Sequence, residues 1–216
     1  PATQLAKITE EGVEFKSIID GSTHFFTPEK SIEIQHNIGA DIIFAFDECT
    51  SPLASYEYQK EAMDRTHRWA LRSLESHKRS GEQALFGIVQ GGRFEDLRKE
   101  SAKVISELGL ARRGGGFDGF GLGGSFDKED MDKAVGWVNA ILPEETPRHL
   151  LGIGEPIDLF GAIENGCDTF DCVAPTRIAR NGQLYTRDGK INVMNAKFTN
   201  IFESIDKKCN CYTCKN

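Results

Sequence analysis

The chain has 216 residues, of which 27% are charged and 39% hydrophobic, and its formal net charge is −7. This balance is typical of a folded globular protein and excludes a largely disordered chain, while no apolar run approaches the roughly 20 residues that a membrane-spanning helix needs. The negative charge also argues against indiscriminate nucleic-acid binding, which depends mostly on neutralising phosphates. Residues 1–7 show no signal-peptide pattern and no initiator methionine, so we expect a cytoplasmic protein without a membrane partner, and a processed or partial chain.

The first predicted elements are a β-hairpin and a helix. Residues 13–18 and 23–26 alternate between polar and apolar side chains, and the Asp-Gly pair between them is a typical hairpin signal. Thr27 is a suitable N-cap and Pro28 suits the first helical position, so we expect a helix from there to Gly39.

Five short apolar segments follow, and an amphipathic helical pattern separates each from the next. The segments are residues 42–46, 84–89, 117–122, 149–153 and a fifth that contains Asp171. The helical patterns cover residues 57–80, 94–108, 128–142 and 156–165. Apolar runs without alternation are typical of strands buried on both faces, and repeated strand–helix units predict a parallel sheet covered by helices.

We interpret these units as a partial TIM barrel, because a common barrel closes with eight units and five are recognisable. No Gly-x-Gly-x-x-Gly motif follows the first strand, which makes an open dinucleotide-binding sheet the weaker alternative. The expected fold is therefore α/β. A partial TIM barrel with a β-rich insertion is expected in residues 1–200, and residues 201–216 are expected to begin a second subdomain.

The carboxyl ends of all barrel strands meet on one face, where active sites lie. Each predicted strand ends in a polar or glycine-rich group, namely Asp47, Gln90, Gly123 with Gly124, residues 152–154, and Asp171. Asp47 and Gln90 can read the hydrogen-bonding edge of a purine, and the glycines let backbone groups approach a ligand. The alternative is that the glycines serve tight turns and that Gln90 caps a helix.

The stretch around Asp171 carries the strongest catalytic signal. Pro175 is expected to end the strand because it lacks an N–H for the ladder, and Arg177 and Arg180 are expected to follow in a short basic loop. A carboxylate can form a covalent intermediate with a sugar carbon, while arginine side chains match phosphate oxygens. The alternative is an aspartate that caps a turn beside two solvated arginines.

The six cysteines fall into two groups. Cys209, Cys211 and Cys214 have a spacing typical of zinc, and a structural tetrahedral site would need a fourth ligand that this chain does not supply. We expect His149 to pack at the start of its strand, and the alternative for the cluster is a set of free thiols. The other cysteines are expected to be reduced, packed thiols: Cys49, Cys167 and Cys172.

Together these motifs resemble the tRNA-guanine transglycosylases, in the bacterial queuine tRNA-ribosyltransferase branch. The matching segments run in order along nearly the whole chain: residues 15–17, 20–21, 31–35, 45–50, 86–92, 152–156, 170–173, 175–177, 179–182 and the C-terminal cysteines. The resemblance implies a TIM barrel followed by a zinc-binding subdomain, which would begin in residues 201–216. The implied reaction exchanges guanine at the tRNA wobble position for a 7-deazaguanine, in queuosine biosynthesis. It also implies tRNA and a guanine or 7-deazaguanine base as partners, and we expect the full-length protein to be a homodimer.

The resemblance also implies roles for individual residues. Asp171 is the implied nucleophile on ribose C1′, which leaves a covalent RNA–enzyme intermediate. The implied base-binding residues are Asp47, Cys49, Gln90, Gly123 and Gly124, and Cys49 favours 7-aminomethyl-7-deazaguanine as the incoming base. The implied RNA-binding residues are Gly152, Ile153, Gly154, Glu155, Pro156, Ile157, Asp158, Thr176, Arg177, Ile178, Ala179 and Arg180. The implied ligands of a structural Zn²⁺ are Cys209, Cys211 and Cys214.

Several features depart from the family pattern. The family's Asp-Ser-Gly-Gly segment, which carries the proposed general acid/base, is absent, as is the histidine that completes the zinc site, so we expect a fragment that is inactive by itself. Residues 125–129 differ from the usual Leu-Ala-Val-Gly-Glu, and residues 110–115 resemble an insertion. Two other functions stay open: a non-catalytic tRNA-binding or partner subunit on the same barrel, and an unrelated barrel glycosidase with Asp47 and Asp171 as its carboxylate pair.

Overall fold

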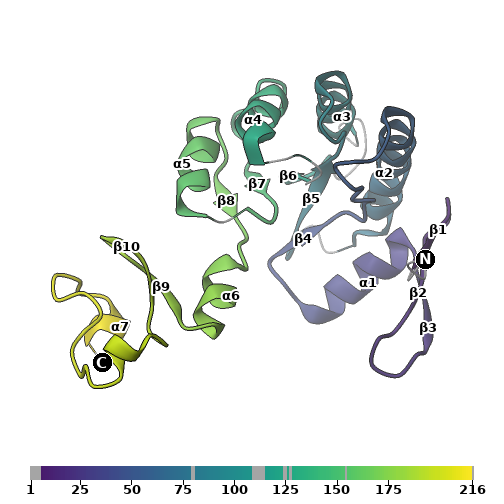
Figure 1. Cartoon of the computed structure of the whole chain (residues 1–216). Coiled ribbons are helices and arrows are strands. Elements are labelled where there is room, and N and C mark those ends of the chain that lie inside the picture. Colours follow the sequence, from purple (N-terminus) through teal and green to yellow (C-terminus); the bar gives the residue numbers. More distant parts are fainter. Residues whose placement is uncertain are drawn as a thin grey trace.

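The computed structural model describes residues 6–78, 81–108, 115–123, 126, 128–153 and 155–215. Within these residues the strands form three sheets. A three-stranded antiparallel sheet lies near the N-terminus, a five-stranded parallel sheet occupies the middle of the chain, and a two-stranded hairpin lies near the C-terminus (Figure 1).

The N-terminal sheet confirms the predicted hairpin. Strands β1 (Ala6–Ile8), β2 (Val13–Lys16) and β3 (Thr23–Phe26) pair in the order β1-β2-β3, and both pairs are antiparallel. The connection between β2 and β3 is a longer loop than a two-residue turn. Inside it, the Asp20 carboxylate accepts hydrogen bonds from the Ser22 backbone N–H at 3.1 Å and from the Ser22 hydroxyl at 2.8 Å.

Helix α1 (Pro28–Ile38) starts and ends where the sequence predicts. The backbone N–H of Lys30 donates to the Thr27 hydroxyl at 3.2 Å, which satisfies one of the free donors of the first turn. At the other end Gly39 has a φ of +76°, and its N–H reaches the carbonyl of Gln35 at 3.1 Å. Both helix caps are therefore confirmed.

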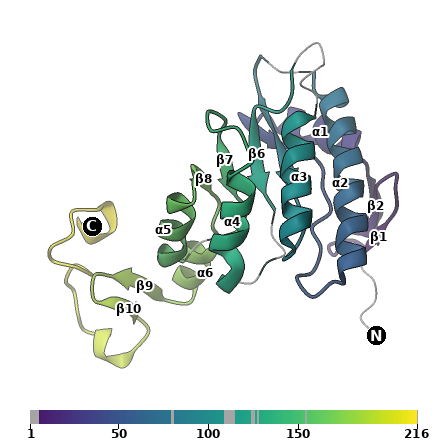
Figure 2. The same cartoon turned by 90° about the horizontal axis from the view of Figure 1, so that it is seen from above.

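The middle of the chain alternates strands with helices. The strands are β4 (Ile42–Phe44), β5 (Ala84–Val89), β6 (Gly119–Leu122), β7 (Arg148–Leu150) and β8 (Thr169–Phe170). The helices are α2 (Tyr56–Ser76), α3 (Glu95–Glu107), η1 (Lys128–Asp130) leading into α4 (Met131–Asn139), and α5 (Pro156–Glu164). The strands pair in parallel in their sequence order, and α2 to α5 form an arc along the outer side of the curled sheet (Figures 1 and 2), so the predicted α/β fold with a partial barrel is confirmed.

Strand β6 explains how the sheet packs on both sides. Phe120 and Leu122 point toward the helices and belong to the buried core. Gly119 and Gly121 alternate with them and lie on the opposite face of the sheet, which we name the inner face. They leave room there for side chains of neighbouring strands. A Cβ on Gly121 would lie 2.7 Å from Cδ1 of Ile88 and 3.1 Å from the ring of Phe44. The glycines of β6 thus allow bulky side chains to cross the inner face.

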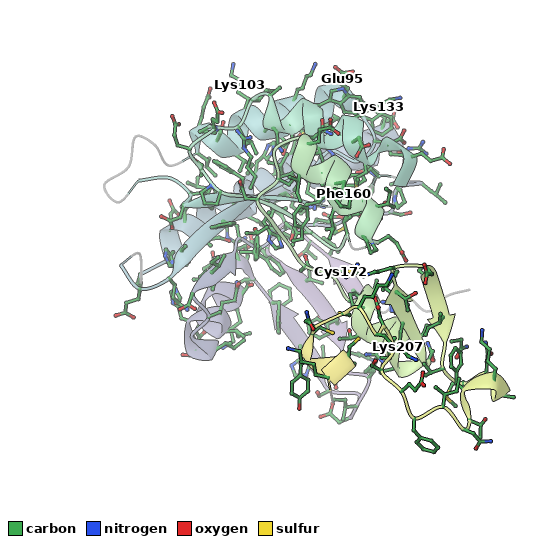
Figure 3. The ribbon with its side chains drawn as sticks, turned by 90° about the vertical axis from the view of Figure 1, so that its left-hand side faces the viewer. Glu95, Lys103, Lys133, Phe160, Cys172 and Lys207 are labelled. Carbon is green, nitrogen blue, oxygen red and sulfur yellow. The ribbon has the colours of Figure 1, made fainter. Side chains whose placement is uncertain are left out.

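The outer surface of the helices is charged. Glu95 and Lys103 on α3 and Lys133 on α4 point away from the sheet (Figure 3). Helix α5 differs, because its apolar side chains Ile157, Phe160 and Ile163 are all exposed. Among the described residues, no helix combines the length and the apolar character that a membrane crossing would require.

The chain after β8 forms a separate set of short elements. They are α6 (Ala174–Arg180), β9 (Gln183–Thr186), β10 (Gly189–Asn192), η2 (Ala196–Phe198) and α7 (Tyr212–Lys215), and they extend from the β8 end of the sheet (Figures 1 and 2). The prediction that Pro175 ends a strand and precedes a loop is wrong. Pro175 lies in the first turn of α6, where its missing N–H would have no partner within the helix. The predicted boundary at residue 200 stays a prediction.

Candidate functional site

The first part of the candidate site lies where β4 and β5 end. Beyond β4, Phe46 packs on Trp69 of α2 with ring centroids 4.9 Å apart, and Asp47 lies beside the end of β5. There Gln90 Nε2 donates a 2.6 Å hydrogen bond to Asp47 Oδ2, while the Gln90 backbone N–H donates to Ser101 Oγ of α3 at 3.1 Å. Two side chains predicted at neighbouring strand ends are thus in direct contact.

Burial gives this pair unusual electrostatics. Gln90 is 3% exposed, and its buried Oε1 accepts no hydrogen bond from the residues that the structure describes. Loss of solvation raises the pKa of the Asp47 carboxyl, an effect that the Gln90 hydrogen bond opposes and the negative charge of Glu48 reinforces. The pair therefore presents a poorly solvated carboxyl group and an unused acceptor, and both can receive hydrogen bonds from N–H groups of a ligand.

A buried carboxylate attaches the segment around Asp47 to α2. Glu48 forms an ion pair with Arg65 and accepts a 2.6 Å hydrogen bond from the Tyr58 hydroxyl. Its backbone N–H donates to Thr66 Oγ1 at 3.0 Å. Since three residues of one helix hold Glu48, the position of Asp47 next to it is well defined.

A buried arginine fixes the ends of β5 and β6. Arg98 of α3 is 1% exposed and donates to the carbonyls of Val89 at 3.2 Å, Gly92 at 2.8 Å and Gly123 at 2.9 Å. Burial lowers the pKa of this guanidinium to about 10. At Gly123 a Cβ would lie 2.4 Å from Gln90 Nε2, so the missing side chain makes room for the Gln90 amide.

The second part of the site lies where β7 and β8 end. Asp171 follows β8 directly, and its side chain is 59% exposed. Its Oδ1 accepts a 2.9 Å hydrogen bond from the backbone N–H of Gly152 and lies 3.2 Å from Nε2 of His149. Gly152 has a φ of +73°, which glycine adopts without strain. The carboxylate is therefore accessible and is oriented through one of its oxygens.

Sequence reasoning misses the position of His149. The residue lies in the middle of β7, its Nδ1 is 2.9 Å from Thr169 Oγ1, and its side chain is 14% exposed. Strand pairing places it directly opposite Thr169, two residues before Asp171, so it contacts the site instead of only packing in its strand. The sequence does contain one signal for this role, because His149 is a polar residue within an otherwise apolar strand segment.

Phe44 connects the two parts of the site. Its ring contacts that of His149 with centroids 5.3 Å apart, although β4 and β7 are not neighbours in the sheet. Gln90 and Asp171 lie at positions that continue the alternation of inner-face residues along β5 and β8, and Asp47 lies beside Gln90 because it accepts the hydrogen bond from the Gln90 amide. Asp47, Gln90 and Asp171 are therefore on one face of the curled sheet.

The predicted RNA-binding residues lie on the two segments that flank Asp171. The first segment is the loop after β7 with the start of α5, and it contains Gly152, Ile153, Glu155, Pro156, Ile157 and Asp158. The second is α6, with Thr176, Arg177, Ile178, Ala179 and Arg180, and both of its arginines are exposed. Glu155 accepts hydrogen bonds from the Tyr185 hydroxyl at 2.8 Å and from Lys190 Nζ at 3.0 Å, so it joins this site to the β9–β10 hairpin. The predicted site residues Gly124 and Gly154 lie outside the described residues.

The predicted metal ligands also come together. The Sγ atoms of Cys209, Cys211 and Cys214 all lie within 4.8 Å of one another, close to strand β9. Soft thiolate donors at this spacing fit a tetrahedral Zn²⁺ that takes one further ligand. Cys49, two residues after Asp47, is instead an exposed thiol.

Comparison with known proteins finds the same family that the sequence motifs resemble. A family model described as queuine tRNA-ribosyltransferase matches residues 1–216. Proteins named queuine tRNA-ribosyltransferase are 50% identical in Thermoanaerobacter sp. (strain X514) and 46% identical in Bacillus subtilis (strain 168). Each of these alignments covers 99% of this chain and 56% or 55% of the relative, so the chain spans about half the length of the curated relatives that it matches. The match along the whole chain shows that it belongs to the queuine tRNA-ribosyltransferase family.

Proposed function

We propose that the protein containing this chain is a tRNA-guanine transglycosylase. It would exchange guanine at the anticodon wobble position for a 7-deazaguanine in queuosine biosynthesis. The observation that carries the proposal is the pairing, on one face of the sheet, of a hydrogen-bonding slot at Asp47 and Gln90 with an accessible carboxylate at Asp171. Membership of the family supports the same reaction.

The base-recognition half of the proposal follows from the donors and acceptors of the slot. A guanine or 7-deazaguanine edge offers a ring N–H and an exocyclic amine, which the Asp47 carboxylate can accept together. Gln90 has Oε1 and a second amide N–H left for the base, because one N–H already donates to Asp47. Donors from a bound base would supply the hydrogen bonds that the poorly solvated Asp47 lacks, and this favours binding.

Further residues complete this half of the proposal. Gly123 with Gly124 would allow the base to lie close to the backbone at the end of β6. Cys49 is exposed beside the slot, and we place it against the substituent of the incoming base, with 7-aminomethyl-7-deazaguanine as the expected substrate.

The chemical half assigns the nucleophile to Asp171. One carboxylate oxygen gives an electron pair to ribose C1′ while the C1′–N9 bond breaks, and its pair leaves with guanine, which takes up a proton. The incoming base then bonds to C1′ and loses its proton, and the pair of the aspartyl–ribose bond returns to Asp171. A base reached in this way must be flipped out of its stack, so that the groups at the strand ends can bind its hydrogen-bonding edge.

The segments that flank Asp171 would hold the RNA. Arg177 and Arg180 are exposed on α6, six and nine residues after the carboxylate, where their guanidinium groups can bind phosphates next to the wobble nucleotide. Residues 152–158, the other predicted RNA-binding segment, would also contact the RNA. The cluster of Cys209, Cys211 and Cys214 would hold a structural Zn²⁺, which supplies cross-links to the C-terminal segment and no chemistry.

The test is exchange of radiolabelled guanine into tRNA by the complete protein. We expect the wild type to exchange and the Asp171→Ala variant to lose at least about 10³-fold in rate, because no other group replaces a missing nucleophile. The matched control is Asp188→Ala, an exposed aspartate in the β9–β10 turn, which should exchange at the wild-type rate. Undiminished exchange by Asp171→Ala would refute the assignment, and wild-type protein that binds tRNA without exchange would favour a non-catalytic subunit.

A further inference from the structure

We propose that His149 and Thr169 form a positioning pair that fixes one oxygen of Asp171 and presents the other to the ribose. The inference rests on the proposed function, because it concerns how the proposed nucleophile is aimed. Neither residue belongs to the sequence motifs that suggest the function. Their role is inferred from their side-chain contacts in the folded structure.

The contacts around Asp171 are asymmetric. Oδ1 receives the Gly152 backbone N–H at 2.9 Å and faces His149 Nε2 at 3.2 Å. Among the residues that the structure describes, Oδ2 accepts no hydrogen bond, and the side chain is 59% exposed. A carboxylate held by two donors on one oxygen keeps its other oxygen free, so we assign Oδ2 as the atom that bonds to C1′.

Hydrogen-bonding rules set the orientation of the His149 ring. A carboxylate can only accept, so the bond to Asp171 requires a proton on Nε2. In a neutral imidazole Nδ1 is then an acceptor, and the Thr169 hydroxyl donates to it across 2.9 Å. The hydroxyl of Thr169 thereby selects the tautomer of His149 that can hold Asp171.

Packing holds the ring in this place. His149 and Thr169 face each other in the pairing of β7 with β8, and the ring of Phe44 covers the imidazole at 5.3 Å. Strands β5 and β6 separate Phe44 from His149, and Gly121 of β6, which pairs with His149, leaves room for the Phe44 ring because it has no side chain. The imidazole is therefore largely buried, at 14% exposure, beside a carboxylate that is open to substrate.

Two variants of His149 separate donation from packing. His149→Phe keeps a ring against Phe44 but removes the donor, and His149→Gln keeps an amide N–H near the position of Nε2. With the complete protein and tRNA, we expect His149→Phe to slow formation of the denaturation-resistant protein–tRNA adduct roughly 10- to 100-fold, as for a misplaced reacting group. His149→Gln should recover most of that loss, and the Kd for tRNA should change less than about threefold in both, because neither variant removes an RNA contact.

The role of Thr169 is tested with an isosteric change. Thr169→Val removes the hydroxyl while keeping the side-chain shape, and we expect adduct formation to slow by about 3- to 10-fold, because the wrong His149 tautomer becomes populated. Thr169→Ser restores the hydroxyl and should restore most of the rate. In the His149→Phe background Thr169→Val should have no additional effect, since the two changes interrupt the same chain of hydrogen bonds.

The chain offers a matched control for the histidine. His24 on β3 also bonds a hydroxyl, Ser22 Oγ at 2.8 Å, and also stacks on a phenylalanine, Phe15 at 5.5 Å, but it has no contact with Asp171. His24→Phe should leave adduct formation unchanged. Adduct formation at the wild-type rate by His149→Phe would overturn the inference, as would an equal loss in His149→Gln and His149→Phe with the folded fraction unchanged.

The two proposals fail in distinguishable ways. If Asp171→Ala still forms the adduct, the nucleophile assignment fails whatever the His149 variants do. If Asp171→Ala forms none while His149→Phe matches the wild type, the proposed function stands and the positioning pair is refuted. Thermal unfolding of each variant, compared with the wild type, separates a lost fold from a misaimed carboxylate.

Discussion

The parallel sheet and the segment after it are stabilised in different ways. The sheet and its helices bury a continuous apolar core that includes Val89, Phe120, Leu122 and Val135. In residues 171–215, all of which the structure describes, no residue is buried, and large apolar side chains such as Phe202 are 94% exposed. Hydrophobic burial therefore accounts for the sheet, whereas the later segment depends on local hydrogen bonds and on the proposed metal cross-link.

The candidate site lies where these two regions meet. Gln90 is held by the buried Ser101 of α3, and Glu48, next to Asp47, is held by the buried Arg65 and Thr66 of α2. Asp171 is the first residue after β8, the last strand of the parallel sheet. Arg177 and Arg180 follow on the exposed helix α6. Under the proposed function, this arrangement would put base recognition on a rigid scaffold and leave phosphate contacts to a less constrained segment, which is a common division of roles in binding sites.

The largest effect is expected from removing the proposed metal. A chelator, or Cys211→Ser, should open residues 181–215 while the parallel sheet stays folded, because structural zinc supplies on the order of 10–16 kcal/mol in small zinc-binding peptides. Hydrogen exchange read by mass spectrometry would report the two regions separately. Cys49→Ser is the control for loss of a thiol elsewhere, and equal loss of protection in the sheet after chelation would contradict the comparison.

The second test exchanges one apolar side chain in each region for alanine. Leu122 is 1% exposed, so Leu122→Ala should lower the free energy of unfolding by about 2–5 kcal/mol through lost burial and a cavity. Phe202→Ala removes a larger side chain that is 94% exposed and should change the free energy by less than about 0.5 kcal/mol. Urea denaturation measures both, and comparable losses would show that Phe202 packs against something in solution.

The pH dependence of stability in the sheet region is expected to depend on His67 of α2. Burial lowers the pKa of His67 to about 4 from its ordinary value of 6.5, and its Nε2 lies 3.0 Å from the Ser101 hydroxyl that also accepts from the Gln90 backbone N–H. As pH falls, His67 is protonated first in the unfolded chain, because its pKa there is higher than in the folded protein. The contribution of neutral His67 to the free energy of unfolding is therefore complete above about pH 6.5 and is lost toward about pH 4, by about 2–3 kcal/mol.

The check is the stability difference between the wild type and His67→Gln, which keeps a polar group facing Ser101. Urea midpoints at several pH values between 7 and 4.5 should show the wild type losing stability relative to the variant as pH falls. The comparison cancels other titrating groups, including Asp47, whose pKa is shifted upward and whose contribution has the opposite sign. Parallel curves for the two proteins would contradict the assignment.

The smallest effect is expected at a helix cap beside the sheet. Thr27→Ala removes the hydroxyl that accepts the Lys30 N–H and should cost about 1 kcal/mol, while Thr27→Ser should cost much less. Because α1 is part of the sheet region, the loss should appear in its unfolding transition and leave hydrogen exchange of residues 181–215 unchanged. Circular dichroism during urea denaturation measures the loss of stability in the sheet region. A change in hydrogen exchange confined to residues 181–215 would be inconsistent with the fold.

Features that depend on neighbouring residues are well predicted by the sequence. Thr27, Pro28 and Gly39 mark the ends of α1 because caps act on backbone groups within one turn. The alternation of apolar segments with amphipathic helices predicts the parallel sheet, and the close spacing of the C-terminal cysteines predicts their cluster. Pro175 is the exception, since a proline suits both the position after a strand and the first turn of a helix.

The sequence by itself therefore determined the order of strands and helices from β2 to β8, the polar groups at the strand ends and the thiol cluster, because these follow from local periodicity and spacing. Only the tertiary structure decided that His149 faces Asp171, that Gly121 admits Phe44, and that Gln90 keeps an unused acceptor. Those contacts join residues far apart in the chain, and they depend on strand register and sheet curvature, which no short segment encodes.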